Sequence, residues 1–122
     1  MPDFRLIVLY VDNPAASAAF YADLLGRQPV ESSANFAMFP LPPVMLGLWS
    51  RREVEPAAAG SPGAMEIDFG ASDAQAVEAC YADWKARGLS IAQKPTEMDF
   101  GYTFVALDPD GHRLRVMALK PQ

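Results

Sequence analysis

The chain has 122 residues, of which 51% are hydrophobic and 20% are charged, so its composition is that of one folded domain and not of a disordered chain. The formal net charge is −5 with ten Lys and Arg residues, which excludes the basic surface typical of nucleic-acid-binding proteins. Apolar runs end well short of the roughly 20 residues that a membrane-spanning helix needs, and the start MPDFR does not resemble a secretion signal. We therefore expect a cytoplasmic protein that binds neither nucleic acid nor membranes.

Cys80 is the only cysteine and His112 is the only histidine. A disulfide within the chain, a cysteine zinc cluster and a two-histidine metal site are thereby excluded. Cys80 falls inside a predicted helix, where we expect a buried and unreactive thiol.

The first half of the chain predicts one strand, one helix and three short strands. Residues 4–11 (FRLIVLYV) are rich in β-branched and aromatic side chains, which favours a mostly buried strand. Asn13 and Pro14 are typical of a helix start, and Gly26 ends a helix that runs to about Leu25. Apolar residues at every fourth position predict the helix face that packs on the sheet: Ala16, Phe20 and Leu24. Strand candidates follow around Pro29, Phe36 and Leu46.

The second half repeats this order after a connector at 51–63, which combines charge, small side chains, Pro and Gly. We expect a strand at 64–69, a helix from Ser72 or Asp73 to Arg87, and strands near Ile91, across 100–107 and across 112–119. The sequence DPDG at 108–111 predicts the hairpin turn between the last two strands.

The two helices also match in letters, since YADL at 21–24 corresponds to YADW at 81–84, an offset near 60 residues. This match falls at the same point of two β-α-β-β-β units, which indicates an internal repeat. The paired residues Tyr21 and Tyr81, together with Trp84, are expected to pack the helices. We predict an α+β fold in which two βαβββ modules, about 1–56 and about 64–122, form one domain with a cup-shaped mixed sheet.

Three segments carry a resemblance to a known family: YVD at 10–12, FYADLLG at 20–26 and DPDGHRL at 108–114. They resemble the vicinal oxygen chelate superfamily, which includes glyoxalases, bleomycin resistance proteins and extradiol dioxygenases. The resemblance covers essentially the whole chain and implies the cup-shaped fold. It also implies a homodimer, because members of the family cover the edges and apolar surface of their open sheets with a partner subunit.

The same resemblance implies that the metal site of the family's enzymes is lost here. Those enzymes use His or Gln on the first strand, Glu on the fourth, His on the fifth and Glu on the eighth. The corresponding residues are Arg5, Gly47, Ala64 or Met65, and Arg115. Arginine has no lone pair to donate, glycine and alanine have no side-chain ligand, and Glu66, one or two places off register, would hold a metal only weakly. We expect no metal and no other cofactor.

The lost metal positions give the cup space and positive charge, which favours a bulky ligand and suits an anionic group. Alternation along the strands adds aromatic and methionine side chains, which pack well against flat aromatic compounds but equally often fill a core. The candidate binding residues are Trp49, Arg115, Met45, Gly47, Phe36, Met38, Tyr102, Phe100, Arg5 and Glu66. We expect Trp49 and Arg115 to face one cavity and contact the ligand together, and Glu66 and Asp68 to share a face near it.

Three functions are compatible with these residues, and the sequence favours the first. One is metal-free sequestration of a planar, hydrophobic small molecule, as in the bleomycin and phenazine antibiotic resistance members of the family, which needs no catalytic residue. Another is a glyoxalase-like or dioxygenase-like enzyme with an atypical active site, including a metal-free one that uses Glu66 or Tyr102 as acid or base. The last is a protein whose role is association alone. The sequence does not identify the ligand or the biological context.

Overall fold

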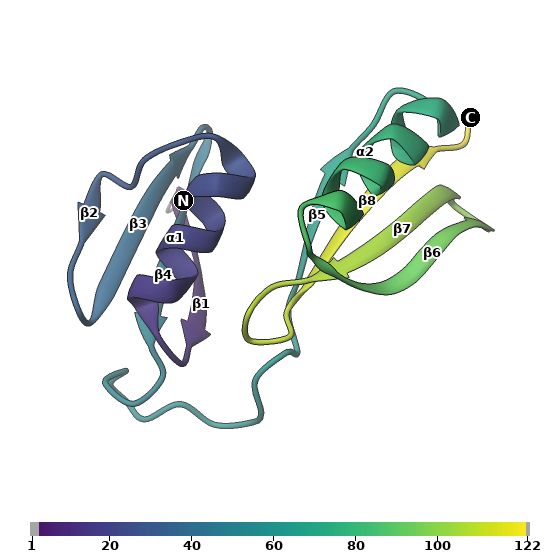
Figure 1. Cartoon of the computed structure of the whole chain (residues 1–122). Helices are drawn as coiled ribbons and strands as arrows, with labels where there is room; N and C mark the ends of the chain where they lie inside the picture. The colour runs from purple at the N-terminus through teal and green to yellow at the C-terminus, as the bar shows by residue number, and fades with distance from the viewer. Residues whose placement is uncertain (1–2, 122) are drawn as a thin grey trace. The chain divides into compact units, whose positions relative to one another are not determined.

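The computed structural model describes residues 3–121, so Met1 and Pro2 of the MPDFR start lie outside the described residues. The chain divides at Pro62 and Gly63 into two compact units, which we call module one and module two (Figure 1). The boundary falls within the predicted connector. Each module has the predicted β-α-β-β-β order, which confirms the α+β class and the internal repeat.

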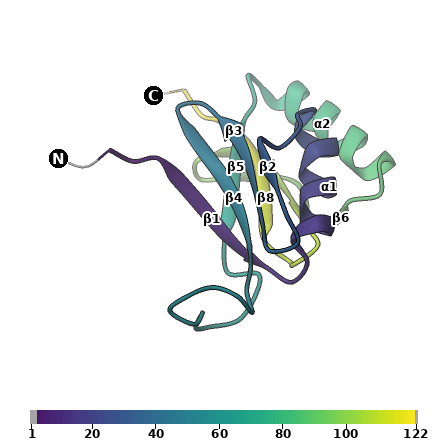
Figure 2. The ribbon, with the colours of Figure 1, turned by 90° about the vertical axis from the view of Figure 1, so that its left-hand side faces the viewer.

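Module one is a four-stranded mixed sheet with one helix. Its elements are β1 (Leu6–Val11), α1 (Pro14–Leu25), β2 (Glu31–Ser32), β3 (Phe36–Leu41) and β4 (Val44–Ser50). The strand order is β1-β4-β3-β2, in which β1 runs parallel to β4 and the other pairs are antiparallel. Figures 1 and 2 show α1 lying along one face of this sheet.

Helix α1 begins and ends as predicted, but it packs on the sheet with a different face. The Asn13 side chain accepts a hydrogen bond from Ala16 N at 3.2 Å, and Gly26 ends the helix with a φ of 64°. The predicted face was wrong: Ala16 is exposed, and Phe20 and Leu24 are only half-buried. The buried residues are instead Pro14, Ser17, Ala18 and Tyr21. Small side chains at 17 and 18 let the helix approach the sheet closely, and the Tyr21 ring fills the space beside them.

Module two has the same architecture. Its elements are β5 (Glu66–Gly70), α2 (Ala74–Ala86), β6 (Ser90–Met98), β7 (Gly101–Leu107) and β8 (Arg113–Leu119). The strand order is β5-β8-β7-β6, with β5 parallel to β8 and the other pairs antiparallel. Strand β6 is longer than the short strand predicted near Ile91 and is irregular between Ile91 and Thr96.

The core of module two is aromatic and confirms that Trp84 and Tyr81 pack the helix. Trp84 lies edge-on to Phe69 and Phe104, with ring centres 5.7 and 5.4 Å apart, and Tyr81 lies 5.5 Å from Phe104. Cys80 on the same helix is half-buried, and burial raises the pKa of its thiol, which disfavours the reactive thiolate. Among residues 3–121, no helix has the length and apolar character required to cross a membrane.

Candidate functional site

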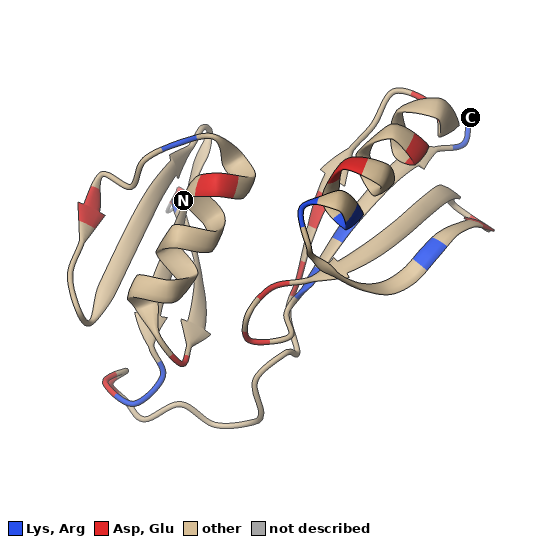
Figure 3. Cartoon of the chain, in the orientation of Figure 1, with Lys and Arg blue, Asp and Glu red and all other residues tan. Residues whose placement is uncertain are grey.

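Each sheet has one face covered by its own helix and one face that this helix leaves open. Side chains alternate along a strand, and paired residues on neighbouring strands point the same way, so the register defines each open face. The open face of module one is mostly apolar on β1, β3 and β4, where it carries Leu6, Val8, Tyr10, Phe36, Met38, Met45, Gly47 and Trp49, and it has Glu31 on β2 beside Met38. The open face of module two carries charge: Glu66, Asp68, Gln93, Thr103, Val105, Arg113, Arg115 and Met117. Figure 3 shows the basic residues of β8 beside acidic residues of β5.

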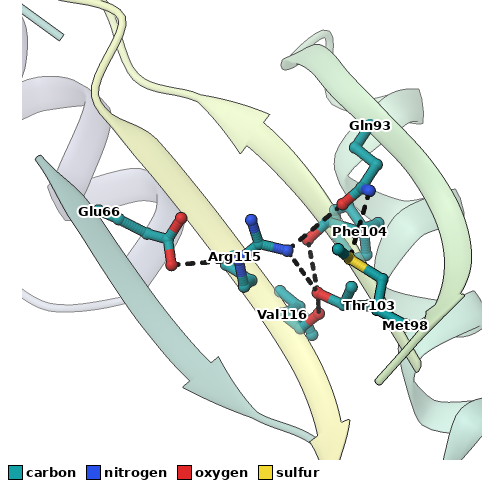
Figure 4. Close-up of polar contacts among 7 residues, drawn as sticks. All are labelled: Glu66, Gln93, Met98, Thr103, Phe104, Arg115 and Val116. Atoms are coloured by element: carbon teal, nitrogen blue, oxygen red, sulfur yellow. Dashed lines mark hydrogen bonds and ion pairs between the residues drawn. The ribbon is translucent and has the colours of Figure 1, made fainter. Parts of the chain in front are cut away.

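Arg115, in the middle of β8, is held from three other strands (Figure 4). Its Nε donates to Glu66 Oε2 on β5 at 3.1 Å, and its Nη1 donates to Gln93 Oε1 on β6 and Thr103 Oγ1 on β7, both at 3.3 Å. The Thr103 hydroxyl donates in turn to the Val116 carbonyl oxygen at 2.8 Å. The side chain of Arg115 is only 13% exposed. These contacts fix the guanidinium in one orientation, which makes it a preorganised cation.

Phe100 joins this group through the face of its ring. The Arg115 Cζ atom lies 5.7 Å from the centre of the Phe100 ring, which is a cation–π contact. Phe100 precedes β7 and does not alternate with it, because Gly101 has a φ of 153° and a Cβ there would overlap the Ala118 carbonyl oxygen. The sequence prediction of one stripe through residues 100, 102 and 104 was therefore wrong for Phe100.

Tyr102, by contrast, lies on the helix-covered face of module two. It pairs with Ala118, and its neighbour in the stripe, Phe104, is fully buried against α2. Burial and the nearby Glu78 carboxylate of α2 raise the pKa of the Tyr102 phenol. Tyr102 therefore lies on the face of the sheet opposite to Arg115, and the prediction that it belongs to the same binding face is wrong.

Glu66 and Asp68 share the open face of β5, as expected, and lie opposite Arg113 and Arg115. Burial, followed by hydrogen bonding to Glu66 and its negative charge, raises the pKa of Asp68 to about 6, although Arg115 opposes this shift. Burial also acts to raise the pKa of Glu66. The net shift of this pKa is nevertheless downward, because hydrogen bonds with Asp68 and Arg115 and the positive charges of the two arginines outweigh burial. A hydrogen bond between two carboxyl groups requires one proton, and the opposite directions of the two pKa shifts assign this proton to Asp68 at pH values below about 6.

A pocket of about 290 Å³ opens beside Arg115 on strands β6, β7 and β8. Its lining residues are Ala92, Gln93, Met98, Val105, Arg113 and Arg115. Gln93 is fixed at its wall, because its amide oxygen accepts from Arg115 and its amide nitrogen contacts the Met98 sulfur at 3.5 Å. The pocket therefore combines two guanidinium groups with apolar side chains.

An aromatic pair marks the open face of module one. The rings of Phe36 and Trp49 meet edge to face, with centres 6.2 Å apart and an angle of 89°. Gly47 makes this arrangement possible, since a Cβ at that position would lie 3.1 Å from Phe36 Cζ and 3.3 Å from Val8 Cγ2. The ring of Phe36 occupies the space that a side chain at 47 would need.

The register shows which residues of the first strand of each module lie opposite Gly47 and Arg115. Arg5 precedes β1 and is exposed, and Val8 is the residue that lies opposite Gly47. On the second module, β5 begins after Ala64, and Asp68 lies opposite Arg115.

The open-face residues do not fit the four-ligand metal site of the family's enzymes. Gly47 pairs with Val8 and Arg115 pairs with Asp68, and of these four open-face residues only Asp68 has a metal-binding side chain. Between residues 3 and 121, no three His, Cys, Asp or Glu side chains come close enough together to hold a metal ion.

The chain belongs to the Glyoxalase/Bleomycin resistance protein/Dioxygenase superfamily, whose family model matches residues 4–116. It is 30% identical over 122 residues to the phenazine antibiotic resistance protein EhpR of Enterobacter agglomerans, across 97% of this chain and 92% of that protein. A protein of Agrobacterium tumefaciens solved by solution NMR is 48% identical, with a TM-score of 0.89 over 99% of this chain and 100% of that one. A glyoxalase/bleomycin resistance protein/dioxygenase from Nocardioides, at 24% identity, shares the fold with a TM-score of 0.82 over 98% of this chain and 84% of its own.

Proposed function

We propose that this protein binds a planar aromatic small molecule without a metal, and that its biological role is resistance to a toxic compound of this kind. The observation that carries the proposal is the open face of module one, where Phe36 and Trp49 form an edge-to-face pair on a mostly apolar surface. An apolar sheet face that bears half-buried aromatic rings suits the flat surface of a fused-ring ligand. The phenazine antibiotic resistance protein at 30% identity supports the same chemistry.

Trp49 and Phe36 are the contacts that we propose for the aromatic ring on module one, and Arg115 is a candidate contact on module two. Met38, Met45 and Gly47 lie on the same face as Trp49, and Glu66 and Phe100 touch Arg115. That Trp49 and Arg115 contact one ligand together stays a prediction.

Tryptophan fluorescence tests the proposal directly. Phenazine titrated into the protein should quench Trp49, which is only half-buried, and should have little effect on Trp84, which is 7% exposed in the core of module two. Trp49→Phe removes the responsive fluorophore, so its remaining emission should no longer change on titration. Unchanged emission of the unaltered protein, together with no heat of binding in calorimetry, would rule out this function.

The raised pKa of Asp68 favours an enzyme as a second candidate function. A carboxyl group with a pKa of about 6 beside a fixed guanidinium is suited to general acid–base chemistry at neutral pH. Mass spectrometry of the ligand after incubation with the protein separates the two candidates, because a binding protein returns it unchanged.

We also propose that the chain forms a homodimer. The edge strand β1 and Phe4, two residues before it, carry exposed apolar side chains, with Phe4 70%, Leu6 41% and Tyr10 42% exposed. Edge strands with exposed apolar side chains are typical sites of association.

A further inference from the structure

We propose that the pocket of module two is a subsite for the carboxylate of an aromatic acid, held by the Arg113 guanidinium and by Nη2 of Arg115. The inference rests on the proposed function and adds to it the chemical class of the ligand, an aromatic acid. The two arginines lie two positions apart on β8 and therefore on the same face of the sheet.

Arg115 has hydrogen-bonding capacity that the protein does not use. Its Nε and Nη1 atoms donate to Glu66, Gln93 and Thr103, whereas Nη2 has no hydrogen-bond partner within residues 3–121. Figure 4 shows this terminal nitrogen as the one without a dashed contact. The fixed orientation of the guanidinium means that an incoming oxyanion meets a donor that is already in place.

Arg113 supplies the second cation. Its side chain lines the pocket and makes no hydrogen bond or ion pair with any other residue of the described chain. Two guanidinium groups on one pocket wall match the two oxygens of a carboxylate, whose negative charge is shared between them.

The charge balance at this face favours an anion when Asp68 is protonated. The groups that face it are Glu66 on the same strand and Arg113 and Arg115 on β8, the only strand paired with β5 among the described residues. Two guanidinium groups then stand against one carboxylate, Glu66, and a ligand carboxylate neutralises the excess. Ionisation of Asp68 removes that excess, so anion binding and proton uptake by Asp68 reinforce each other.

The remaining walls decide which part of the ligand enters. Ala92, Met98 and Val105 are apolar, and a volume of about 290 Å³ is at the small end for a ligand site. The pocket therefore fits the acid-bearing end of an aromatic compound, with the carboxylate toward β8 and the ring edge toward Met98.

Calorimetric titration of matched probes tests the inference. Phenazine-2-carboxylate and phenazine-2-carboxamide present the same ring system with and without the negative charge. We expect the acid to bind the unaltered protein about tenfold or more tighter than the amide. Arg113→Gln should lower the affinity for the acid by about fivefold or more and leave that for the amide unchanged. The matched control is Arg87→Gln, which removes the same charge from the end of α2 and should change neither affinity.

The titrations test the carboxylate subsite and the proposed function separately. Equal binding of acid and amide, or equal losses in Arg113→Gln and Arg87→Gln, would overturn the subsite while binding of the aromatic ring still stands. Binding of neither probe would remove the proposed function itself. As a second measurement, the affinity of the unaltered protein for the acid should fall by severalfold as the pH rises from 5.5 to 8. Asp68→Asn should abolish this fall, and a pH dependence that persists in Asp68→Asn would count against the coupling to Asp68.

Discussion

Gly47 and Arg115 occupy equivalent positions in the two modules. Gly47 pairs with Val8 on the first strand and Met38 on the third strand of module one, just as Arg115 pairs with Asp68 and Val105 in module two. In module one the space at this position is filled by the ring of Phe36, whereas in module two it holds a fixed cation. One repeated architecture thus carries an aromatic face in its first copy and a polar, charged face in its second.

Replacing Trp49 with Ala is expected to weaken binding of a planar aromatic ligand by about 1–3 kcal/mol, because the variant loses the larger ring of the Phe36–Trp49 pair. Isothermal titration calorimetry measures the change. Trp49→Phe keeps an aromatic face and should retain most of the affinity. A dissociation constant that does not change in Trp49→Ala would show that this face does not contact the ligand.

Gly47→Val should destabilise the protein by about 1–3 kcal/mol, because the new side chain overlaps the space held by Phe36 and Val8. Urea unfolding gives the free energy, and the near-ultraviolet circular dichroism of Trp49 should change as Phe36 moves. Gly70→Val is the matched control, since no atom lies within 4 Å of a Cβ built there. Equal stability of the two variants would contradict the packing at Gly47.

The pKa of Asp68 predicts a pH-dependent stability. Folding raises this pKa from 3.8 to about 6, so the folded chain binds the proton more tightly than the unfolded chain. The contribution of Asp68 to the free energy of unfolding therefore falls as the pH rises from about 4 to about 6 and stays low above that. Asp68→Asn should melt at a higher temperature than the unaltered protein at pH 8, and this gain should shrink or vanish at pH 4. Asp99→Asn, in the turn before β7, serves as control, and a gain that is the same at both pH values would exclude this origin.

Removal of metal is expected to have no effect on stability, because Gly47 and Arg115 stand where the family's enzymes have ligands and neither can donate to a metal. Thermal unfolding before and after treatment with a chelator measures this. A large fall in the midpoint that zinc, nickel or manganese reverses would show a bound metal, since a ligand of the folded state stabilises it by mass action.

Multi-angle light scattering should give about twice the chain mass of 13.3 kDa at micromolar concentration, as expected of a homodimer. Replacing the exposed edge residue Leu6 with Lys should shift the equilibrium toward the monomer. A mass near 13.3 kDa for the unaltered chain would exclude the dimer under these conditions.

The sequence by itself determined the element order, the internal repeat and the family. Local signals were sufficient here, since Asn13, Pro14 and Gly26 delimit the first helix and DPDG at 108–111 precedes the last strand, and each acts through the backbone of a few adjacent residues. The match between Tyr21 and Tyr81 likewise needs no tertiary information.

Only the tertiary structure decided which side chains share a face and touch. Strand register depends on partners distant in the sequence, and it places Val8 opposite Gly47 and Asp68 opposite Arg115. Phe100 does not continue the side-chain alternation of β7, because Gly101 lies between it and Tyr102. The backbone of Gly101 passes too close to Ala118 for any Cβ. The network of Arg115 with Glu66, Gln93 and Thr103 joins four strands, and the raised pKa of Asp68 arises from the same assembly. Such contacts arise from packing between strands, which spacing along the chain does not encode.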